Sequence, residues 1–169
     1  MKSETIHIII TGGTIDSYFE ATKDTIVPNK KTIIPETLQW LKVDKKFHFS
    51  KVCMKDSRAL TEKDRQAILS AVQKSPYKKI IITHGTYTMP DTARYLKERL
   101  KISNKAVVFT GSMLPISGFS PSDGTFNLGY AIAVSEYMRP GIYIAMNGRI
   151  FDPLRAVKDL TIGKFSSKS

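Results

Sequence analysis

The sequence contains one cysteine and three histidines among its 169 residues. A single cysteine cannot form a disulfide within the chain, and Cys53 falls in a segment that alternates like a strand. We therefore interpret Cys53 as a packed thiol and not as a nucleophile. Three scattered histidines and one cysteine do not supply the clustered ligands of a zinc site, so we expect neither a metal nor another cofactor.

Long apolar stretches are also missing from the sequence. No window approaches the unbroken run of about 20 apolar residues that a membrane-spanning helix needs, so we expect no membrane partner. The first residues lead straight into a strand-like segment, without the apolar region and cleavage site of a secretory signal. We therefore expect a cytoplasmic protein. Its length of 169 residues is usual for one domain, so we also expect a single domain over residues 1–169.

Acidic residues are few: the sequence has 15 Asp and Glu but 26 Lys and Arg, which gives a formal net charge of +11 at pH 7. Such an excess would suit a nucleic-acid binder if the basic residues were clustered. They are instead spread in small groups, without interleaved aromatic residues or a helix-turn-helix pattern. We interpret the charge as that of a solvated surface and do not expect nucleic acid as a partner.

Apolar runs of strand length alternate with segments of helical period, and this pattern is typical of an α/β fold. Residues 80–82 and 107–109 are apolar without alternation, as expected of central strands that are covered on both faces. Crossovers between parallel strands would give a doubly wound three-layer sandwich with a mainly parallel sheet. The predicted strands cover residues 5–10, 47–54, 79–83, 106–110 and 141–146.

Four helices are predicted between these strands. Thr61 and the acidic residues after it indicate the capped start of a helix whose apolar stripe includes Ile68 and Val72. Proline is favoured in the first turn of a helix, and this predicts helices over about 36–42 and 91–100. Aspartate is favoured at an N-cap, and this predicts a helix over about 123–138 that is capped by Asp123. Asn147-Gly148-Arg149 predicts a tight turn that leads to a short final ribbon.

Three predicted strands end in similar loops, which are Thr11-Gly12-Gly13-Thr14, Thr83-His84-Gly85-Thr86 and Thr110-Gly111-Ser112. The carboxyl ends of parallel strands are where ligands bind, so we expect these loops to converge on one crevice. Glycine lets the backbone approach a ligand, and threonine and serine supply nucleophiles, a combination that suits acyl transfer. Neither nucleotide-binding glycine fingerprint is present. The alternative interpretation is that these threonines only close turns.

At these loops the sequence resembles the bacterial-type asparaginase family of amidohydrolases. The matching segments are residues 11–15, 84–89, 110–113 and 123–128, which occur in family order and span nearly the whole chain. The resemblance implies that Thr14 is the nucleophile, that Thr86 is a second catalytic threonine, and that Lys158 is the lysine paired with it. It also implies that Ser57 holds the substrate carboxylate and that Gly13, Gly85 and Ser112 border the substrate. For Lys158, an ordinary surface lysine is the alternative.

The sequence departs from the family pattern in two places. Tyr87 stands where the family has an aspartate that receives the substrate's ammonium group, so we count Tyr87 as a substrate-binding residue of altered chemistry. In the polar segment 17–31, which we predict to be a mobile lid, Val27 stands where the family has a tyrosine, and Tyr18 is the nearest aromatic substitute. Most family members also carry a second domain, for which we expect no counterpart in this sequence.

These features lead to a first hypothesis, a single-domain amidohydrolase that converts a small carboxamide, asparagine or a relative of it, into an acid and ammonia. A second hypothesis is a catalytically silent domain of the same fold that binds a small ligand. A third, resting on basicity and analogy alone, is a component of an RNA-associated amidotransferase. Family members assemble through this domain, so we expect a homodimer or larger assembly.

Overall fold

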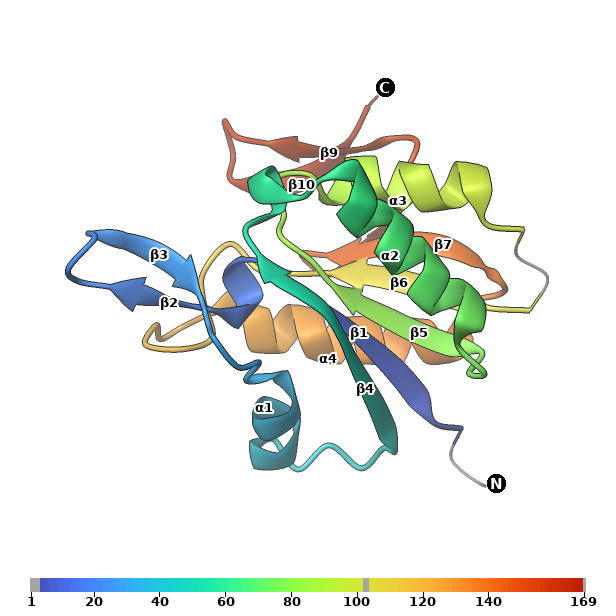
Figure 1. Ribbon diagram of the computed structural model, residues 1–169, viewed down its shortest axis with the longest axis horizontal. Coiled ribbons are helices and arrows are strands. Elements are labelled where there is room, and N and C mark those ends of the chain that lie inside the picture. The colour runs from blue at the N-terminus through green and yellow to red at the C-terminus, as the bar shows by residue number, and fades with distance from the viewer. Residues whose placement is uncertain (1–3, 102–103, 169) are drawn as a thin grey trace.

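The computed structural model describes residues 4–101 and 104–168, and its centre is a six-stranded sheet in the order β4-β1-β5-β6-β7-β8 (Figure 1). The first five strands in this order are parallel to one another, and β8 is antiparallel to β7. The predicted mainly parallel α/β sandwich is therefore confirmed. The strands are β1 (Ile6–Gly12), β4 (Phe47–Lys55), β5 (Lys79–Thr83), β6 (Ala106–Thr110), β7 (Gly141–Met146) and β8 (Arg149–Phe151).

Helices cover both faces of this sheet. The helices α2 (Glu62–Lys74) and α3 (Met89–Arg99) pack on one face, and α1 (Ile34–Trp40) and α4 (Asp123–Tyr137) pack on the other. Along β5, Ile80 and Ile82 belong to the core on the α2 and α3 side, whereas Ile81 belongs to the opposite core. All three are fully buried. The prediction of central strands covered on both faces is confirmed.

The strand bounds differ from the prediction at the site end of the sheet. We predicted 5–10 for the first strand, but β1 continues through Thr11 to Gly12 after an irregularity in its pairing with β4. Gly12 there pairs with Lys55, the last residue of β4, which lies one residue past the predicted end. Gly13 then donates its N–H to the Lys55 carbonyl at 2.9 Å. The sheet therefore extends to the edge of the candidate site.

The helix starts follow local capping chemistry, with one correction. Thr61 forms the predicted capping box with Asp64 at the start of α2. The helix α4 is capped by Ser122, whose hydroxyl accepts the N–H of Gly124, and not by Asp123. The carboxylate of Asp123 instead accepts the N–H groups of the loop after β6. The helices α1 and α3 each start two residues before their predicted first residue, because their prolines lie within the first turn.

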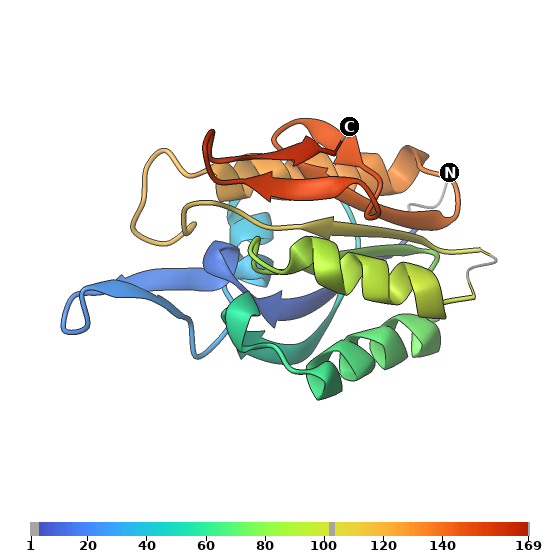
Figure 2. The same cartoon turned by 90° about the horizontal axis from the view of Figure 1, so that it is seen from above.

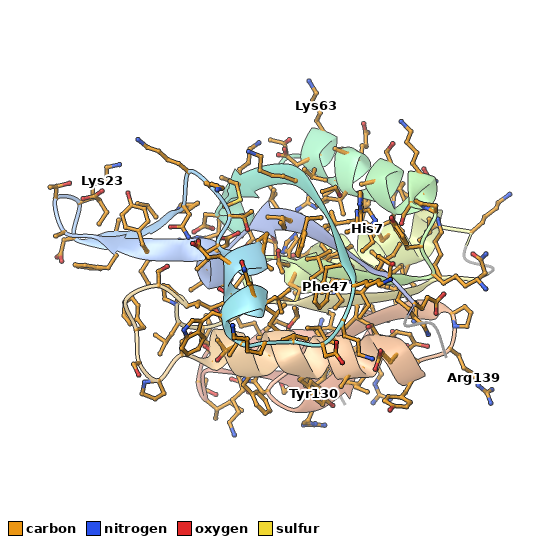
Figure 3. All side chains as sticks on the ribbon, turned by 90° about the horizontal axis from the view of Figure 1, so that it is seen from below. His7, Lys23, Phe47, Lys63, Tyr130 and Arg139 are labelled. Atoms are coloured by element: carbon orange, nitrogen blue, oxygen red, sulfur yellow. The ribbon has the colours of Figure 1, made fainter. Side chains whose placement is uncertain are left out.

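Two ribbons extend from this core. The segment predicted as a loop lid folds into a hairpin of β2 (Ser17–Glu20) and β3 (Thr25–Pro28), which projects from the body (Figure 2). Lys23 lies at its tip (Figure 3). Asn147 and Gly148 form the predicted turn with positive φ, but Arg149, predicted as its third residue, already begins β8. The predicted final ribbon follows β8 and consists of β9 (Ala156–Asp159) and β10 (Lys164–Ser167).

Two findings on the described residues bear on the class of protein. None of the helices in residues 4–101 and 104–168 is long and apolar enough to cross a membrane. The same residues contain no group of three or more His, Cys, Asp or Glu side chains arranged to hold a metal ion.

Burial raises the pKa of the Cys53 thiol to about 11, so the thiol stays protonated near neutral pH.

Candidate active site

The loops after β1 and β5 leave the sheet where its strand order reverses. Numbering only the five parallel strands along the chain gives the order 2-1-3-4-5, and the reversal lies between β1 and β5. In open α/β sheets, ligands bind outside the carboxyl ends of the strands at this point. The loop after β1 carries Thr14 and the loop after β5 carries Thr86. The topology therefore places both threonines at the expected crevice.

Glycines allow the site loops to touch. A Cβ added at Gly13 would lie 2.3 Å from the backbone nitrogen of Gly85, and one added at Gly85 would lie 2.6 Å from the Cβ of Ser57. Gly13 also has a φ of 81°, which side-chain-bearing residues rarely adopt. The loops after β1 and β5 thus meet backbone to backbone, the Ser57 side chain of the loop after β4 packs against Gly85, and glycine is required at both contacts.

A cavity of about 630 Å³ lies over this junction. It brings together the predicted residues of three loops and of the final ribbon. Phe19 and Ile26 of the β2–β3 hairpin, together with Met113 and Phe119, add apolar surface to its wall. The predicted residues that line it are Gly13, Thr14, Ser57, Gly85, Thr86, Tyr87 and Lys158.

Lys158 enters the cavity from β9 and contacts one of the two threonines. Its Nζ donates a hydrogen bond of 2.8 Å to Thr86 Oγ1. The Thr86 side chain is almost fully buried, whereas Thr14 is half-buried. Burial lowers the pKa of the Lys158 ammonium, the positive charge of Arg58 lowers it further, and Asp56 opposes the shift. Lys158 is therefore easier to deprotonate than a surface lysine.

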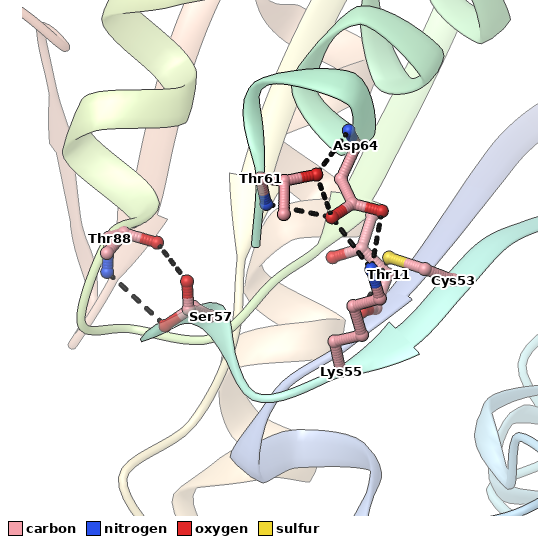
Figure 4. Close-up of polar contacts among 7 residues, drawn as sticks. All are labelled: Thr11, Cys53, Lys55, Ser57, Thr61, Asp64 and Thr88. Carbon is pink, nitrogen blue, oxygen red and sulfur yellow. Dashed lines mark hydrogen bonds and ion pairs between the residues drawn. The ribbon is translucent and has the colours of Figure 1, made fainter. Parts of the chain in front are cut away.

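Ser57 is fixed by Thr88, the second residue after Thr86. The Thr88 N–H donates to Ser57 Oγ at 3.3 Å, and the Thr88 hydroxyl donates to the Ser57 carbonyl at 2.9 Å (Figure 4). On the other side of Ser57, Lys55 donates to both carboxylate oxygens of Asp64 in α2. Ser57 is buried to 2% exposure. Its hydroxyl is therefore held in place at the cavity wall by Thr88, while the Lys55–Asp64 ion pair ties the end of β4 to α2.

Two predicted site residues lie away from the cavity wall. Ser112 is fully buried, and its hydroxyl donates to the Leu114 carbonyl. Its loop follows β6, which is one strand farther from the reversal than β5. Tyr18 faces the opposite side of the hairpin from the cavity, pairs with Val27 and donates its hydroxyl to Glu20. Neighbouring strand residues point to opposite faces, so Phe19 lines the cavity in its place.

Arg58 and Asp56 are cavity residues that the sequence interpretation missed. Arg58 donates to Asp56 through Nε at 3.1 Å and through Nη2 at 2.7 Å. The guanidinium carbon also lies 5.5 Å from the ring centroid of Tyr87, and Lys158 Nζ lies 5.2 Å from the same centroid. The signal in the sequence was their position on either side of Ser57, together with their charge. Arg58 and Lys158 therefore both lie beside the Tyr87 ring.

His84 lies on a site loop but is fully buried behind the cavity wall. Its Nδ1 is 2.8 Å from the carbonyl oxygen of Gly85, and burial lowers its pKa to about 4. The imidazole is therefore neutral near pH 7. The position and charge of His84 suit a group that orients the Gly85 backbone and not a general base in the cavity.

The sequence matches the profile of the asparaginase N-terminal family over residues 5–164. The chain therefore belongs to the asparaginase family, and the match covers most of its length. This finding agrees with the α/β fold and with the resemblance carried by the three strand-end loops.

Individual relatives are L-asparaginases and glutaminase-asparaginases. The L-asparaginase 1 of Escherichia coli strain K12 is 29% identical over 167 residues, which cover 94% of this chain and 48% of the relative. The glutaminase-asparaginase of Acinetobacter glutaminasificans is 33% identical over 114 residues, which cover 63% of this chain and 33% of the relative.

Solved structures give the same picture. The thermostable L-asparaginase from Thermococcus kodakarensis aligns with a TM-score of 0.80 at 30% identity, over 96% of this chain and 51% of that chain. The probable cytoplasmic L-asparaginase from Campylobacter jejuni aligns with a TM-score of 0.82 at 27% identity, over 97% of this chain and 53% of that chain. This chain spans about half the length of these proteins.

Proposed function

We propose that this chain is a threonine-dependent amidohydrolase that converts a small carboxamide into the corresponding acid and ammonia. Thr14 is the nucleophile, and the Thr86–Lys158 pair moves the proton. The observation that carries the proposal is the hydrogen bond from Lys158 to Thr86 in a cavity that Thr14 also lines. An alcohol needs a nearby base or relay to become a useful nucleophile, and this pair supplies one.

The reaction proceeds through two acyl transfers. The Thr14 oxygen attacks the amide carbon, and its proton passes toward Thr86 and neutral Lys158. The C–N bond then breaks, the nitrogen takes up a proton and leaves as ammonia, and the acyl group remains as an ester on Thr14. A water molecule attacks this ester with its proton going to the same pair. The acid leaves, and the Thr14 hydroxyl is restored.

The loop geometry supports the stabilisation of the oxyanion in this scheme. Gly13 and Gly85 bring two backbone segments into contact beside the nucleophile, with no side chains between them. Backbone N–H groups aimed at a developing oxyanion are worth about 10²–10³ in turnover each. Ser57, held by Thr88, is the group in our scheme that binds a carboxylate of the substrate.

Tyr87 alters the choice of substrate in our scheme. A phenol near neutral pH has no negative charge with which to bind the ammonium group of asparagine. The Arg58 guanidinium, which stays charged, lies beside its ring, and so does Lys158, which is positive until it loses the proton that the mechanism requires. We therefore propose that the enzyme hydrolyses free asparagine poorly and accepts amides without an α-ammonium group more readily.

The proposal is tested by Thr14→Ala. Ammonia release from a panel of small amides should become undetectable in this variant, while its melting temperature stays within about 2 °C of the wild type, since Thr14 is only half-buried. The matched control is Thr125→Ala, which removes a threonine in α4 that does not line this cavity. Wild-type-like activity in Thr14→Ala, within tenfold, would remove Thr14 from the mechanism.

A silent ligand-binding domain is the second candidate, and two observations favour it. Position 87 carries a tyrosine and not a carboxylate, and the Lys158 hydrogen bond goes to Thr86 and not directly to Thr14. In this case the purified protein would release no ammonia from asparagine, glutamine or their deaminated analogues. It would still bind a small carboxylate in the cavity, which calorimetry would detect.

We also propose that the chain forms a homodimer or larger assembly in the cytoplasm. The outer side of α4 presents the apolar stripe of Phe126, Tyr130, Ala133 and Tyr137, of which Tyr137 is 85% exposed. Figure 3 labels Tyr130 on this helix. Such a stripe suits an isologous contact between two copies. The proposed location follows a structural relative described as probably cytoplasmic. Light scattering that gives the mass of one chain at micromolar concentration would contradict the assembly.

A further inference from the structure

Arg58 is the most exposed charged group beside Tyr87, and only part of its donor capacity is used. A guanidinium has five N–H donors, and Asp56 engages those on Nε and Nη2 along one edge. Its Nη1 is not used in that pair. The Arg58 side chain is 67% exposed and lines the same cavity as Thr14 and Ser57. A second anion can therefore reach the guanidinium from the cavity.

The charges around Tyr87 favour an anion over an ammonium group. Arg58 is the permanent cation, with its guanidinium carbon 5.5 Å from the ring centroid, and Lys158 Nζ, at 5.2 Å, adds a second positive charge only while it is protonated. The acidic neighbour, Asp56, is already paired with Arg58 through both carboxylate oxygens, and these hydrogen bonds hold its pKa below the usual range. The other acidic side chain that lines the cavity, Asp24, lies on the β2–β3 hairpin.

We infer that Arg58 is a specificity-determining residue that binds a carboxylate of the substrate, so that the preferred substrates are monoamides of dicarboxylic acids without an α-amino group. Succinamate is the probe of this class, because it is asparagine without the ammonium group. Its carboxylate lies between Ser57 and Arg58, and its amide carbon lies at Thr14. The inference rests on the proposed function for the amide end of the substrate.

Arg58 has a competing explanation, which is that it only holds the Asp56–Arg58 segment in shape. The two roles differ in what Asp56→Asn does. If Arg58 binds the substrate, removing the charge of Asp56 frees the guanidinium, and anion binding strengthens. If the pair is only structural, Asp56→Asn and Arg58→Gln both disturb the segment and weaken every ligand alike.

The experiment measures kcat/KM for succinamate and for butyramide, a neutral amide of the same length, together with calorimetric binding of succinate. In Arg58→Gln, the succinamate-to-butyramide ratio should fall at least tenfold, and succinate should bind at least tenfold more weakly. In Asp56→Asn, the ratio should rise and succinate should bind more tightly than to the wild type. Lys63→Gln, which removes a charge from the exposed surface of α2 (Figure 3), should leave the ratio within twofold of the wild type.

The outcomes separate this inference from the proposed function. If ammonia is released but Arg58→Gln leaves the ratio within twofold of the wild type, Arg58 does not select the substrate and the amidohydrolase proposal stands. If no amide is hydrolysed but succinate binding depends on Arg58 as stated, the enzyme proposal fails and the anion site stands. If Asp56→Asn and Arg58→Gln lower both rates and succinate binding equally, Arg58 is structural and the inference is overturned.

Discussion

Lys158 Nζ and Thr86 Oγ1 are joined by a hydrogen bond of 2.8 Å, although the two residues are 72 positions apart in the chain. The contact exists because the β9–β10 ribbon packs against the core on the α3 side, through Ala156 and Phe165. Ala156 is fully buried at the start of the strand that carries Lys158. The final ribbon thus completes the site that the loops after β1 and β5 begin.

The first prediction concerns the pH dependence that this pair imposes. Neutral Lys158 accepts the proton in our scheme, and burial lowers its pKa, so kcat/KM should rise with pH along a limb whose midpoint lies below the ordinary lysine value of about 10.4. The measurement is ammonia release from succinamate between pH 6 and 10. Lys158→Met should lose at least about 10²-fold, within the range for a general base.

The control for this prediction is Lys164→Met, which removes an exposed lysine from the other strand of the same ribbon. It should retain the wild-type pH profile. A profile in Lys158→Met that still rises with the same midpoint would assign the titration to another group. Such a result would leave the Thr86–Lys158 hydrogen bond with a structural role only.

The close approach of Gly13 and Gly85 leads to the second prediction. In Gly13→Ala the new Cβ would lie 2.3 Å from Gly85 N on a backbone with φ of 81°. Strained backbone of this kind costs about 1–3 kcal/mol, and the displaced loops should lower activity at least about tenfold. Chemical denaturation and ammonia release measure the two effects.

Gly129→Ala is the matched control for that substitution. Gly129 lies inside α4, and an added Cβ would meet no atom within 4 Å. Alanine has the higher helix propensity by about 1 kcal/mol, so this variant should be more stable than the wild type with unchanged activity. If the two substitutions affected stability alike, the contact between the first two site loops would be looser than the structure indicates.

The sequence predicted a segment of this structure well where the segment's own residue pattern determines its fold, and poorly where no such pattern exists. The bounds of β5, β6 and β7 were predicted to the residue, because each is a short apolar run between polar turns. The hairpin of β2 and β3 was missed because it pairs only with itself and keeps mostly exposed or half-buried side chains, so no buried periodicity marks it.

The residues of the candidate site were likewise predicted or missed according to how much of their position the sequence alone determines. The strand-end rule placed Thr14 and Thr86 together, because it depends on topology alone. It could not exclude Ser112, since the distance of its strand from the order reversal appears only in the assembled sheet. The prediction missed Arg58 because its orientation toward Tyr87 follows from its pairing with Asp56, and no sequence motif indicates that contact.

The third prediction concerns the stability of the fold in acid. Burial lowers the pKa of His84 to about 4, and burial together with the charges of His48 and Lys105 does the same for His7. Between pH 6.5 and about 4, His7 and His84 bind protons in the unfolded chain but stay neutral in the folded chain. The free energy of unfolding should therefore fall as the pH drops through this window, by up to about 3 kcal/mol for each histidine.

Urea denaturation of wild type and His84→Asn at several pH values measures this effect. The variant should lose stability less steeply between pH 6.5 and 4, with a slope that differs by up to about 1.4 kcal/mol per pH unit. Above pH 7 the imidazole is neutral in both states, so the two slopes should coincide there. Equal slopes throughout the acid window would mean that folded His84 takes up a proton as readily as the unfolded residue does.

The last prediction concerns Tyr87→Asp, which introduces a carboxylate at this position of the cavity. A substrate ammonium group that loses its water needs a charged partner, and a missing charge-assisted hydrogen bond costs about 1.5–3 kcal/mol. The introduced carboxylate would also offset the two cations, Arg58 and Lys158, that lie beside the ring in the wild type. The kcat/KM for asparagine should therefore rise at least about tenfold relative to that for succinamate.

Tyr87→Phe separates the charge of this residue from its shape, because it removes only the hydroxyl. It should keep the wild-type preference for succinamate over asparagine, since neither ring carries a negative charge near pH 7. Both ratios are measured by ammonia release at neutral pH, on protein whose folding is checked by circular dichroism. If the wild type already hydrolyses asparagine efficiently and Tyr87→Asp changes nothing, another carboxylate binds the ammonium group. Asp56 would then be the first candidate, because it lines the same cavity and its side chain is 43% exposed in its pairing with Arg58.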